Sequence, residues 1–193
     1  MARPATYDRD QALQQAMAVF WRQGFLGTSI RDLSFATGLN PGSLYGAFDS
    51  KRGIFLAALE TYFTELRVQV NGILGADGPP LTRVHKFFEE LIKDAASDPE
   101  ARGCLLVNTL LETPTRDDEI NRRLNEMFED IEAQFAAVLE EARRQGSLRS
   151  DSEPQALARF LVTVVYGLRV YNRRHPGLAR LREIAKQSLA ALR

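Results

Sequence analysis

Cysteine, histidine and long apolar runs are scarce in this chain of 193 residues, which has one cysteine and two histidines. A single cysteine excludes a disulfide framework within the chain and fits a reducing compartment. No apolar run reaches the roughly 20 residues that cross a bilayer. Residues 1–10 also lack an apolar stretch followed by a cleavage site, so we expect a cytoplasmic protein without a membrane partner.

The net charge is zero, because the chain has 25 basic and 25 acidic residues. The two signs are unevenly distributed. Residues 1–55 contain six basic and four acidic side chains, which gives +2 and leaves −2 for residues 56–193. A surplus of this size permits a small DNA-facing surface near the N-terminus, but it does not establish one.

The signatures of common enzyme classes are missing. The sequence contains no glycine-rich phosphate loop and no nucleophile elbow. A di-iron helical enzyme would need Glu-x-x-His pairs, but neither His85 nor His175 has a glutamate three residues before it. We therefore expect no catalytic residues, no metal site and no cofactor. An all-helical enzyme is kept only as the alternative from another class.

Apolar residues recur at helical spacing almost throughout the chain, whereas the alternation typical of strands is absent. Glycine, proline and capping residues divide this pattern into about nine helices, so we predict an all-α fold. The clearest loop is 72–80, which contains three glycines and two prolines. The predicted helices lie near residues 9–23, 29–36, 41–48, 51–71, 82–96, 103–112, 120–145, 154–174 and 178–192.

Two short predicted helices, 29–36 and 41–48, are separated by a glycine turn and match the helix-turn-helix pattern. In that motif the first helix braces the second, whose N-terminal residues face base edges in the major groove. Gly42 and Ser43 are small enough for close approach to DNA, and the Tyr45 hydroxyl suits a phosphate oxygen. By spacing alone, a helical hairpin inside a bundle is an equally good interpretation.

Capping residues mark where these helices begin. Thr28 is predicted to cap the second helix, and Ser50 the fourth. Ser29 and Lys51, which follow these caps, lie where free N–H groups and the helix dipole favour a phosphate. Pro41, with its fixed φ, suits the first position of the third helix.

One set of residues follows a fixed order through the first four predicted helices. It consists of Gly24-Phe25, Thr28-Ser29-Ile30-Arg31-Asp32-Leu33, Ala36, Gly38, Ser43-Leu44-Tyr45, Phe48 and Lys51. With this order of apolar, glycine and polar positions, residues 8–63 resemble the TetR/AcrR family of transcription regulators. Tyr7-Asp8-Arg9-Asp10, ahead of the first helix, is also similar to members of that family.

The resemblance implies a helix-turn-helix DNA-binding domain at 6–66, with the motif at 29–48, and a larger ligand-binding and dimerisation domain at 67–193. It implies a sequence-specific regulator of transcription, a repressor that binds double-stranded operator DNA and is released by a small-molecule effector. It also implies a homodimer formed through helices near 154–174 and 178–192. The candidate pocket side chains carry few charges, so we expect a small, largely apolar ligand.

Two sets of site residues are predicted. The DNA-binding residues are Thr28, Ser29, Arg31, Pro41, Gly42, Ser43, Leu44, Tyr45 and Lys51. By the resemblance, Arg31 and residues 41–44 lie near base edges, and the others contact phosphates. The ligand-pocket residues are Phe87, Phe88, Leu91, Cys104, Phe128, Phe135 and Tyr166. Taken singly, these aromatic side chains are expected in the core, and only as a group do they suggest a pocket.

Cys104 supports an alternative function. It stands at the start of a predicted helix beside Arg102, and both features favour the reactive thiolate. In this alternative the protein senses oxidants or electrophiles through the thiol. The competing interpretation is a buried cysteine that acts as a small apolar residue. It is favoured because free cysteine is among the most buried residue types.

Overall fold

The computed structural model describes residues 8–112, 117–149 and 151–192, and within these ranges the chain is all-α, as predicted. The helices are α1 (Arg9–Gly27), α2 (Ile30–Thr37), α3 (Pro41–Phe48), α4 (Lys51–Leu74), α5 (Pro80–Ser97), α6 (Leu105–Glu112), α7 (Asp118–Arg144), α8 (Pro154–Asn172) and α9 (Leu178–Leu189). A 3₁₀ turn, Ala190–Leu192, follows α9. None of the described helices has both the length and the apolar character needed to span a membrane.

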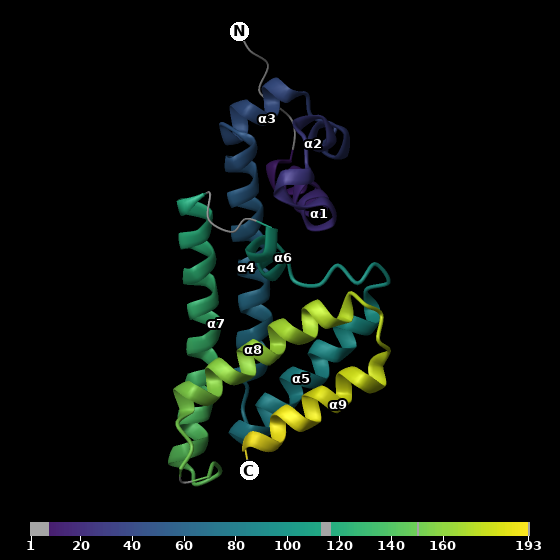
Figure 1. Ribbon diagram of the computed structural model, residues 1–193. Coiled ribbons are helices and arrows are strands. Elements are labelled where there is room, and N and C mark those ends of the chain that lie inside the picture. The colour runs from purple at the N-terminus through teal and green to yellow at the C-terminus, as the bar shows by residue number, and fades with distance from the viewer. Residues whose placement is uncertain (1–7, 113–116, 150, 193) are drawn as a thin grey trace.

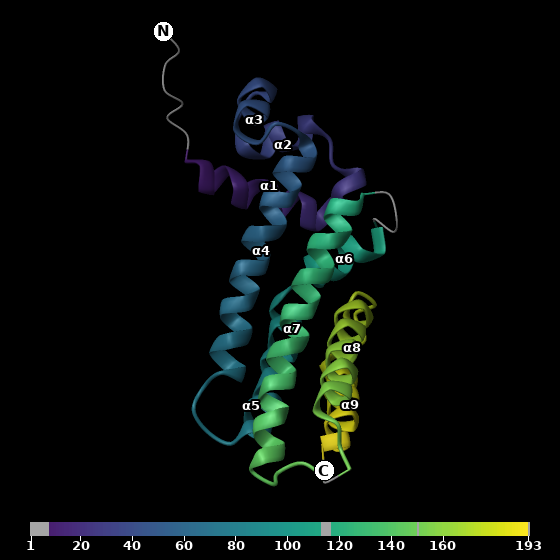
Figure 2. The same cartoon turned by 90° about the vertical axis from the view of Figure 1, so that its left-hand side faces the viewer.

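The helices form two parts that share α4 (Figure 1). α1, α2 and α3 lie together at one end, and α5, α7, α8 and α9 form the larger part at the other. α4 runs from α3 into the larger part, where it packs against α5 and α7. Viewed from the side, α8 and α9 form an outer layer of the larger part (Figure 2). The predicted domain boundary at 66–67 falls inside α4, so a movement of this helix reaches both parts.

A small aromatic and aliphatic core holds α1, α2 and α3 together. Phe20 of α1 and Phe55 of α4 are fully buried, and their rings meet edge to face with centroids 4.9 Å apart. Leu33 of α2 and Leu44 of α3 are fully buried in the same core. Burial of a side chain of this size contributes roughly 1.5–3 kcal/mol, so these residues fix α2 and α3 against α1 and α4.

Local caps set most helix boundaries where the sequence predicts them. Ser50 caps α4, and Gly38 ends α2 in the left-handed conformation with φ 68°. α5 begins at Pro80 rather than at residue 82, because a proline is tolerated in the first turn, where its missing N–H has no helical partner. The predicted end of α6 before Pro114 lies outside the described residues.

Gly53 occupies a position where two parts of the chain approach closely. A Cβ at this position would overlap the carbonyl oxygen of Phe48, across the tight turn between α3 and α4. Asp49 in the same turn has a φ of 64°. Because this turn sets the angle between α3 and α4, the glycine helps to determine where α3 points.

Candidate nucleic-acid interface

α2 and α3 form a helix-turn-helix in which both N-termini carry side-chain caps. Ser29 accepts a hydrogen bond from the Asp32 N–H at 3.2 Å, and the Asp32 carboxylate accepts one from the Ser29 N–H at 2.8 Å. Asn40 accepts from the Ser43 N–H at 2.8 Å, and Pro41 occupies the first turn of α3. These bonds satisfy N–H groups that a helix start otherwise leaves free, so the local sequence fixes both helices.

The start of α2 carries two opposite charges. The Ser29 hydroxyl donates to the Asp32 carboxylate at 2.6 Å, and this bond, with the one from the Ser29 N–H, holds the pKa of Asp32 below its usual range. Arg31 is exposed and forms no ion pair with another residue in the described part of the chain. Its guanidinium is therefore available to a base edge or a phosphate.

The N-terminal half of α3 presents small residues and one tyrosine to solvent. The solvent-facing positions are Pro41, Gly42, Ser43, Tyr45 and Gly46, of which Ser43 is half-buried and Tyr45 is 44% exposed. The opposite side of α3 is buried in the small core. α3 lies at the end of the molecule farthest from α9 (Figure 1), where a DNA duplex has access to it.

The side chains of two predicted DNA contacts are buried. Leu44 is fully buried, because it is the apolar anchor that holds α3 on the core, and its side chain does not reach the surface. Thr28 is 2% exposed, and its hydroxyl donates to the Gly24 carbonyl at 2.6 Å instead of capping α2. The cap of α2 is Ser29. With its hydroxyl buried in this way, the Thr28 side chain is not free to bind a phosphate.

Lys51 lies at this surface, but main-chain groups already hold it. Its Nζ donates to the carbonyl oxygens of Phe25 and Thr28 at 2.8 Å each, and lies 4.5 Å from the Phe25 ring centroid. An ammonium has three N–H donors, so one is left for a phosphate. Lys51 therefore ties the start of α4 to the segment between α1 and α2, and its contact with DNA stays a prediction.

The predicted ligand-pocket residues pack largely against one another. The rings of Phe87 and Phe135 meet edge to face with centroids 4.9 Å apart, and those of Phe128 and Tyr166 also lie 4.9 Å apart. Burial raises the pKa of the Tyr166 hydroxyl well above its ordinary value. The structure places Phe87 and Phe135 in the core, whereas Phe128 and Tyr166 are partly buried and pack against it. The role of the set as a pocket stays a prediction.

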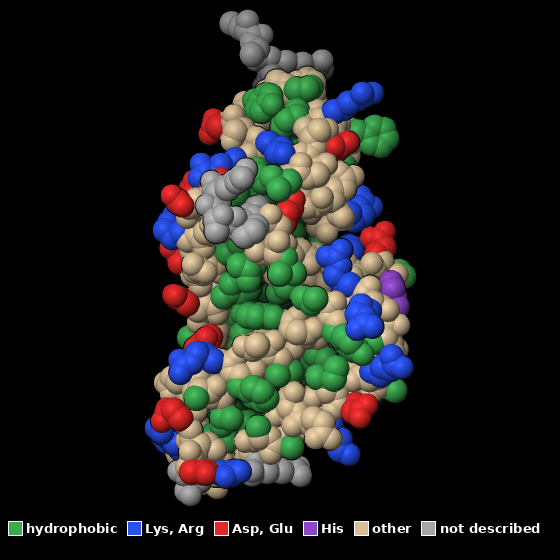
Figure 3. All heavy atoms as spheres, in the orientation of Figure 1, with side chains coloured by type: hydrophobic (Ala, Val, Ile, Leu, Met, Phe, Trp, Pro, Cys, Tyr) green, Lys and Arg blue, Asp and Glu red, His purple; other side chains and the backbone are tan. Residues whose placement is uncertain are grey.

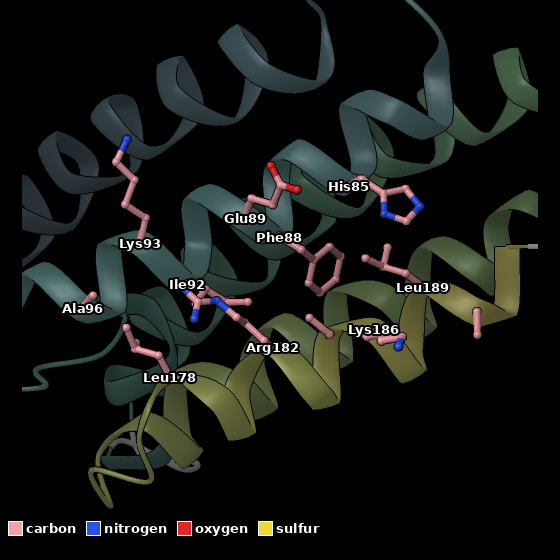
Figure 4. A pocket seen from close by; sticks show the side chains of 12 residues that line it. His85, Phe88, Glu89, Ile92, Lys93, Ala96, Leu178, Arg182, Lys186 and Leu189 are labelled. Carbon is pink, nitrogen blue, oxygen red and sulfur yellow. The ribbon is translucent and has the colours of Figure 1, made fainter.

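A cavity of about 730 Å³ lies between α5 and α9 (Figure 4). Phe88, which the sequence predicts as a pocket residue, and Ile92 line it from α5, and Leu189 lines it from α9. Arg182 and Lys186 of α9 also line it and are exposed. Its volume falls within the roughly 300–1,000 Å³ typical of small-molecule sites.

Cys104 directly precedes α6 and is 8% exposed. Burial, followed by the neighbouring Cys104 thiol, raises the pKa of the Tyr62 hydroxyl well above its ordinary value. Tyr166 has the same two leading causes for its raised pKa. The thiol therefore lies near tyrosines of α4 and α8, and its low exposure fits the interpretation of Cys104 as a buried core residue.

Two features at this end of the molecule were not predicted. Phe35 of α2 is 92% exposed, and helical spacing could have shown it, because Phe35 lies off the inward stripe that contains Leu33. Glu112 of α6 accepts hydrogen bonds from the N–H groups of Phe25 and Leu26, 87 and 86 residues away in sequence. No local pattern reveals a contact of this kind.

Two short capped helices, the second with an exposed N-terminal face at the end of the molecule, define a helix-turn-helix DNA-binding protein. Residues 12–58 match the family model for bacterial regulatory proteins of the tetR family, and residues 80–176 match the tetracyclin repressor-like C-terminal domain. The chain belongs to the TetR family and is a DNA-binding transcription regulator.

Individual relatives agree with this assignment. The uncharacterized HTH-type transcriptional regulator YezE of Bacillus subtilis (strain 168) is 32% identical over 163 residues, 83% of this chain and 84% of the relative. The HTH-type transcriptional repressor ComR of Escherichia coli (strain K12) is 27% identical over 97% of this chain and 90% of its own. A cysteine mutant of the TetR family regulator CifR, solved in complex with 26-bp double-strand operator DNA, has a TM-score of 0.89 at 29% identity, with 100% of both chains covered.

Proposed function

We propose that the protein is a cytoplasmic, homodimeric repressor that recognises its operator through α3 and is released by a small, largely apolar ligand. The observation that carries this proposal is the exposed N-terminal half of α3, held in place by the fully buried Leu44. Its relative ComR is named a repressor, and the CifR mutant is complexed with operator DNA. Likeness to both proteins supports operator binding and repression by this chain.

The proposed DNA contacts are Ser29, Arg31, Pro41, Gly42, Ser43, Tyr45 and Lys51. Pro41 and Gly42 carry no side-chain hydrogen-bonding group, so they discriminate bases by shape and by contact with thymine methyl groups. Ser43 adds a hydroxyl that donates to or accepts from a base edge. Tyr45 and Lys51 bind phosphate oxygens, which fixes the register of α3 without reading sequence.

Apolar side chains on the outer layer support the dimer. Phe160 and Val170 of α8 are 45% and 41% exposed, and Ile184 of α9 is 36% exposed. In the space-filling view, hydrophobic side chains gather over the face on which α8 and α9 cross the front of the molecule (Figure 3). Two such faces related by a two-fold axis would cover each other, which is the self-complementary contact that a symmetric dimer needs.

The effector is proposed to bind beside α5. The aromatic set around Phe135 is closely packed, so a ligand entering there must displace side chains, whereas the cavity beside Phe88 is already open. α5 borders both locations and packs against α4, which carries α3 at its N-terminal end. A ligand at either place can therefore change the tilt of α4 and so move α3.

Genomic selection tests this proposal. Purified protein is mixed with fragmented genomic DNA from its source organism, and the bound fragments are sequenced. We expect a small set of fragments that share an inverted repeat, with half-sites about one helical turn, roughly 34–36 Å, apart. A screen for compounds that release these fragments then identifies the effector. Fragments enriched without any shared sequence would contradict operator recognition.

A further inference from the structure

α1 is interrupted at Gly24, whose φ of 75° and ψ of 175° are not helical. Residues after such a break behave like the start of a new helix, so their N–H groups need acceptors from elsewhere. The N–H groups of Phe25 and Leu26 donate to the two carboxylate oxygens of Glu112, at 2.8 and 2.5 Å. Glu112 is the last residue of α6, so α6 bonds directly to the main chain beside α2.

The Glu112 carboxylate is in close contact with the break in α1 at Gly24. A Cβ built on Gly24 would overlap this carboxylate, so the glycine allows the approach. Glu112 forms no ion pair with another residue of the described chain, and the two N–H groups are its hydrogen-bond partners. Hydrogen bonds to an ionised acceptor are about twice as strong as neutral ones, so this contact holds its two partners firmly.

The segment 25–28, which we call the corner segment, is held from a second side by Lys51. Glu112 accepts from its N–H groups, and Lys51 donates to its carbonyl oxygens. The next residue, Arg52, bonds the Asp117 carboxylate ahead of α7 at 2.6 Å. Charged groups from α4 and α6 therefore clamp the corner segment, and α4 is tied in turn to α7.

We propose that Glu112 is a positioning residue for operator binding, because it transmits the position of α6 to α2 and α3 through the corner segment. This inference rests on the proposed recognition of DNA by α3. The chain has a fold similar to that of the operator-bound CifR mutant over its whole length, with a TM-score of 0.89. In this proposal, the arrangement with the clamp closed is the one that binds DNA. Without the clamp, α1–α3 adopt additional orientations relative to the rest of the chain. Fewer dimers then have both α3 helices at the spacing that the operator requires.

Two variants and a matched control measure the effect on DNA. Glu112→Ala removes both acceptor oxygens, and Glu112→Gln retains one. The control is Glu129→Gln, because Glu129 is exposed on α7 and has no hydrogen bond or ion pair with the described chain. Operator affinity is measured on a fragment from the genomic selection, at a temperature at which circular dichroism shows every variant folded. We expect affinity to fall about 3- to 30-fold for Glu112→Ala, less for Glu112→Gln and not at all for the control.

The distance between the two DNA-binding domains separates positioning from simple stabilisation. A spin label is attached at Gly46→Cys in a Cys104→Ser background, because a side chain at Gly46 meets open space. Without DNA, we expect a narrow distance distribution with Glu112 present and a broader or shifted one with Glu112→Ala. Hydrogen exchange at Phe25 and Leu26 should also become faster. An unchanged distribution would overturn the proposal, even if Glu112→Ala lowers the melting temperature. These two readouts need no operator, so they stay informative if genomic selection fails.

Gly24→Ala provides an independent test through a double-mutant cycle. With Glu112 present, the added methyl group displaces the carboxylate and also strains a backbone with positive φ. In the Glu112→Ala background only the strain remains. The fold loss of affinity caused by Gly24→Ala should therefore be several times smaller in that background. Equal losses in both backgrounds would show that the carboxylate does not act through this contact, and would overturn the proposal.

Discussion

Lys51 donates two hydrogen bonds to main-chain carbonyls and has one donor left for DNA. Lys51→Ala should therefore weaken binding to all DNA sequences about equally. It should also flatten the slope of log affinity against log salt by roughly 0.9 for each phosphate that the ammonium no longer neutralises. Fluorescence anisotropy at several salt concentrations measures both effects, with Lys86→Ala on α5 as the control. A lower melting temperature with an unchanged salt slope would show that Lys51 serves only the fold.

Ser43 and Leu44 are neighbours on α3 with opposite environments, and their substitutions should separate recognition from stability. Leu44→Ala should lower the free energy of unfolding by about 2–5 kcal/mol, because it leaves a cavity beneath α3. Ser43→Ala should leave the unfolding midpoint nearly unchanged and alter the selected operator sequence. Urea denaturation and repeated DNA selection measure the two properties. If the selected sequence is the same for Ser43→Ala and for the unchanged chain, Ser43 does not contact a base.

Thr28 and Leu44 show why a sequence motif predicts a site only in part. The motif marks positions that recur, but it does not separate those that contact DNA from those that hold the recognition helix in place. Helical spacing from Phe48 places Leu44 on the inward side of α3, so its burial was accessible to sequence reasoning. The burial of Thr28 was not, because its hydroxyl bonds the carbonyl at the break in α1.

At the scale of elements, helix boundaries were predictable because their causes are local. Asp8, Asn40 and Ser50 each accept a hydrogen bond from a main-chain N–H two or three residues later, as capping residues do. The contact between α6 and the corner segment was not predictable, because it joins residues far apart in the chain.

The outer layer formed by α8 and α9 leads to a prediction about assembly. Phe160→Asp combined with Ile184→Asp should convert the dimer to a monomer, because each substitution places a charge in an apolar contact. Val68→Asp is the matched control, since Val68 is 69% exposed on α4 and lies outside the outer layer. Light scattering at micromolar concentration reports the mass. If the unchanged chain is a monomer, or if only the control substitution abolishes the dimer, the dimer interface is not formed by the outer layer.

At the scale of the whole molecule, a ligand and the operator must weaken each other's binding by the same factor, typically about 1–3 kcal/mol of coupling. Cys104→Ser separates the ligand mechanism from the thiol alternative. We expect the variant to release DNA on ligand binding as the unchanged chain does, because Cys104 is 8% exposed. Anisotropy with labelled operator measures release. If an oxidant releases DNA from the unchanged chain but not from Cys104→Ser, and no small molecule releases DNA from either protein, the thiol is the sensor instead.

The ligand site was the part of the molecule that sequence predicted least. Aromatic residues at helical spacing fill a core and line a pocket with the same pattern, and only packing distinguishes the two. The rings of Phe87 and Phe135 pack against each other and leave no space between them. The cavity beside Phe88 has one wall formed by α9, which lies about 90 residues further along the chain. By contrast, the all-α fold and the helix-turn-helix followed from spacing, caps and motif order.

The central claim is that α3 recognises a specific DNA sequence. The most direct test compares the affinity of the protein for its selected fragment with that for the same fragment scrambled at both half-sites, at physiological salt. Specific regulators typically prefer their site by at least about 10³-fold, and we expect a preference of that order, which Ser43→Ala reduces. Equal affinity for both fragments would contradict the account, because binding would then rest on phosphate contacts alone.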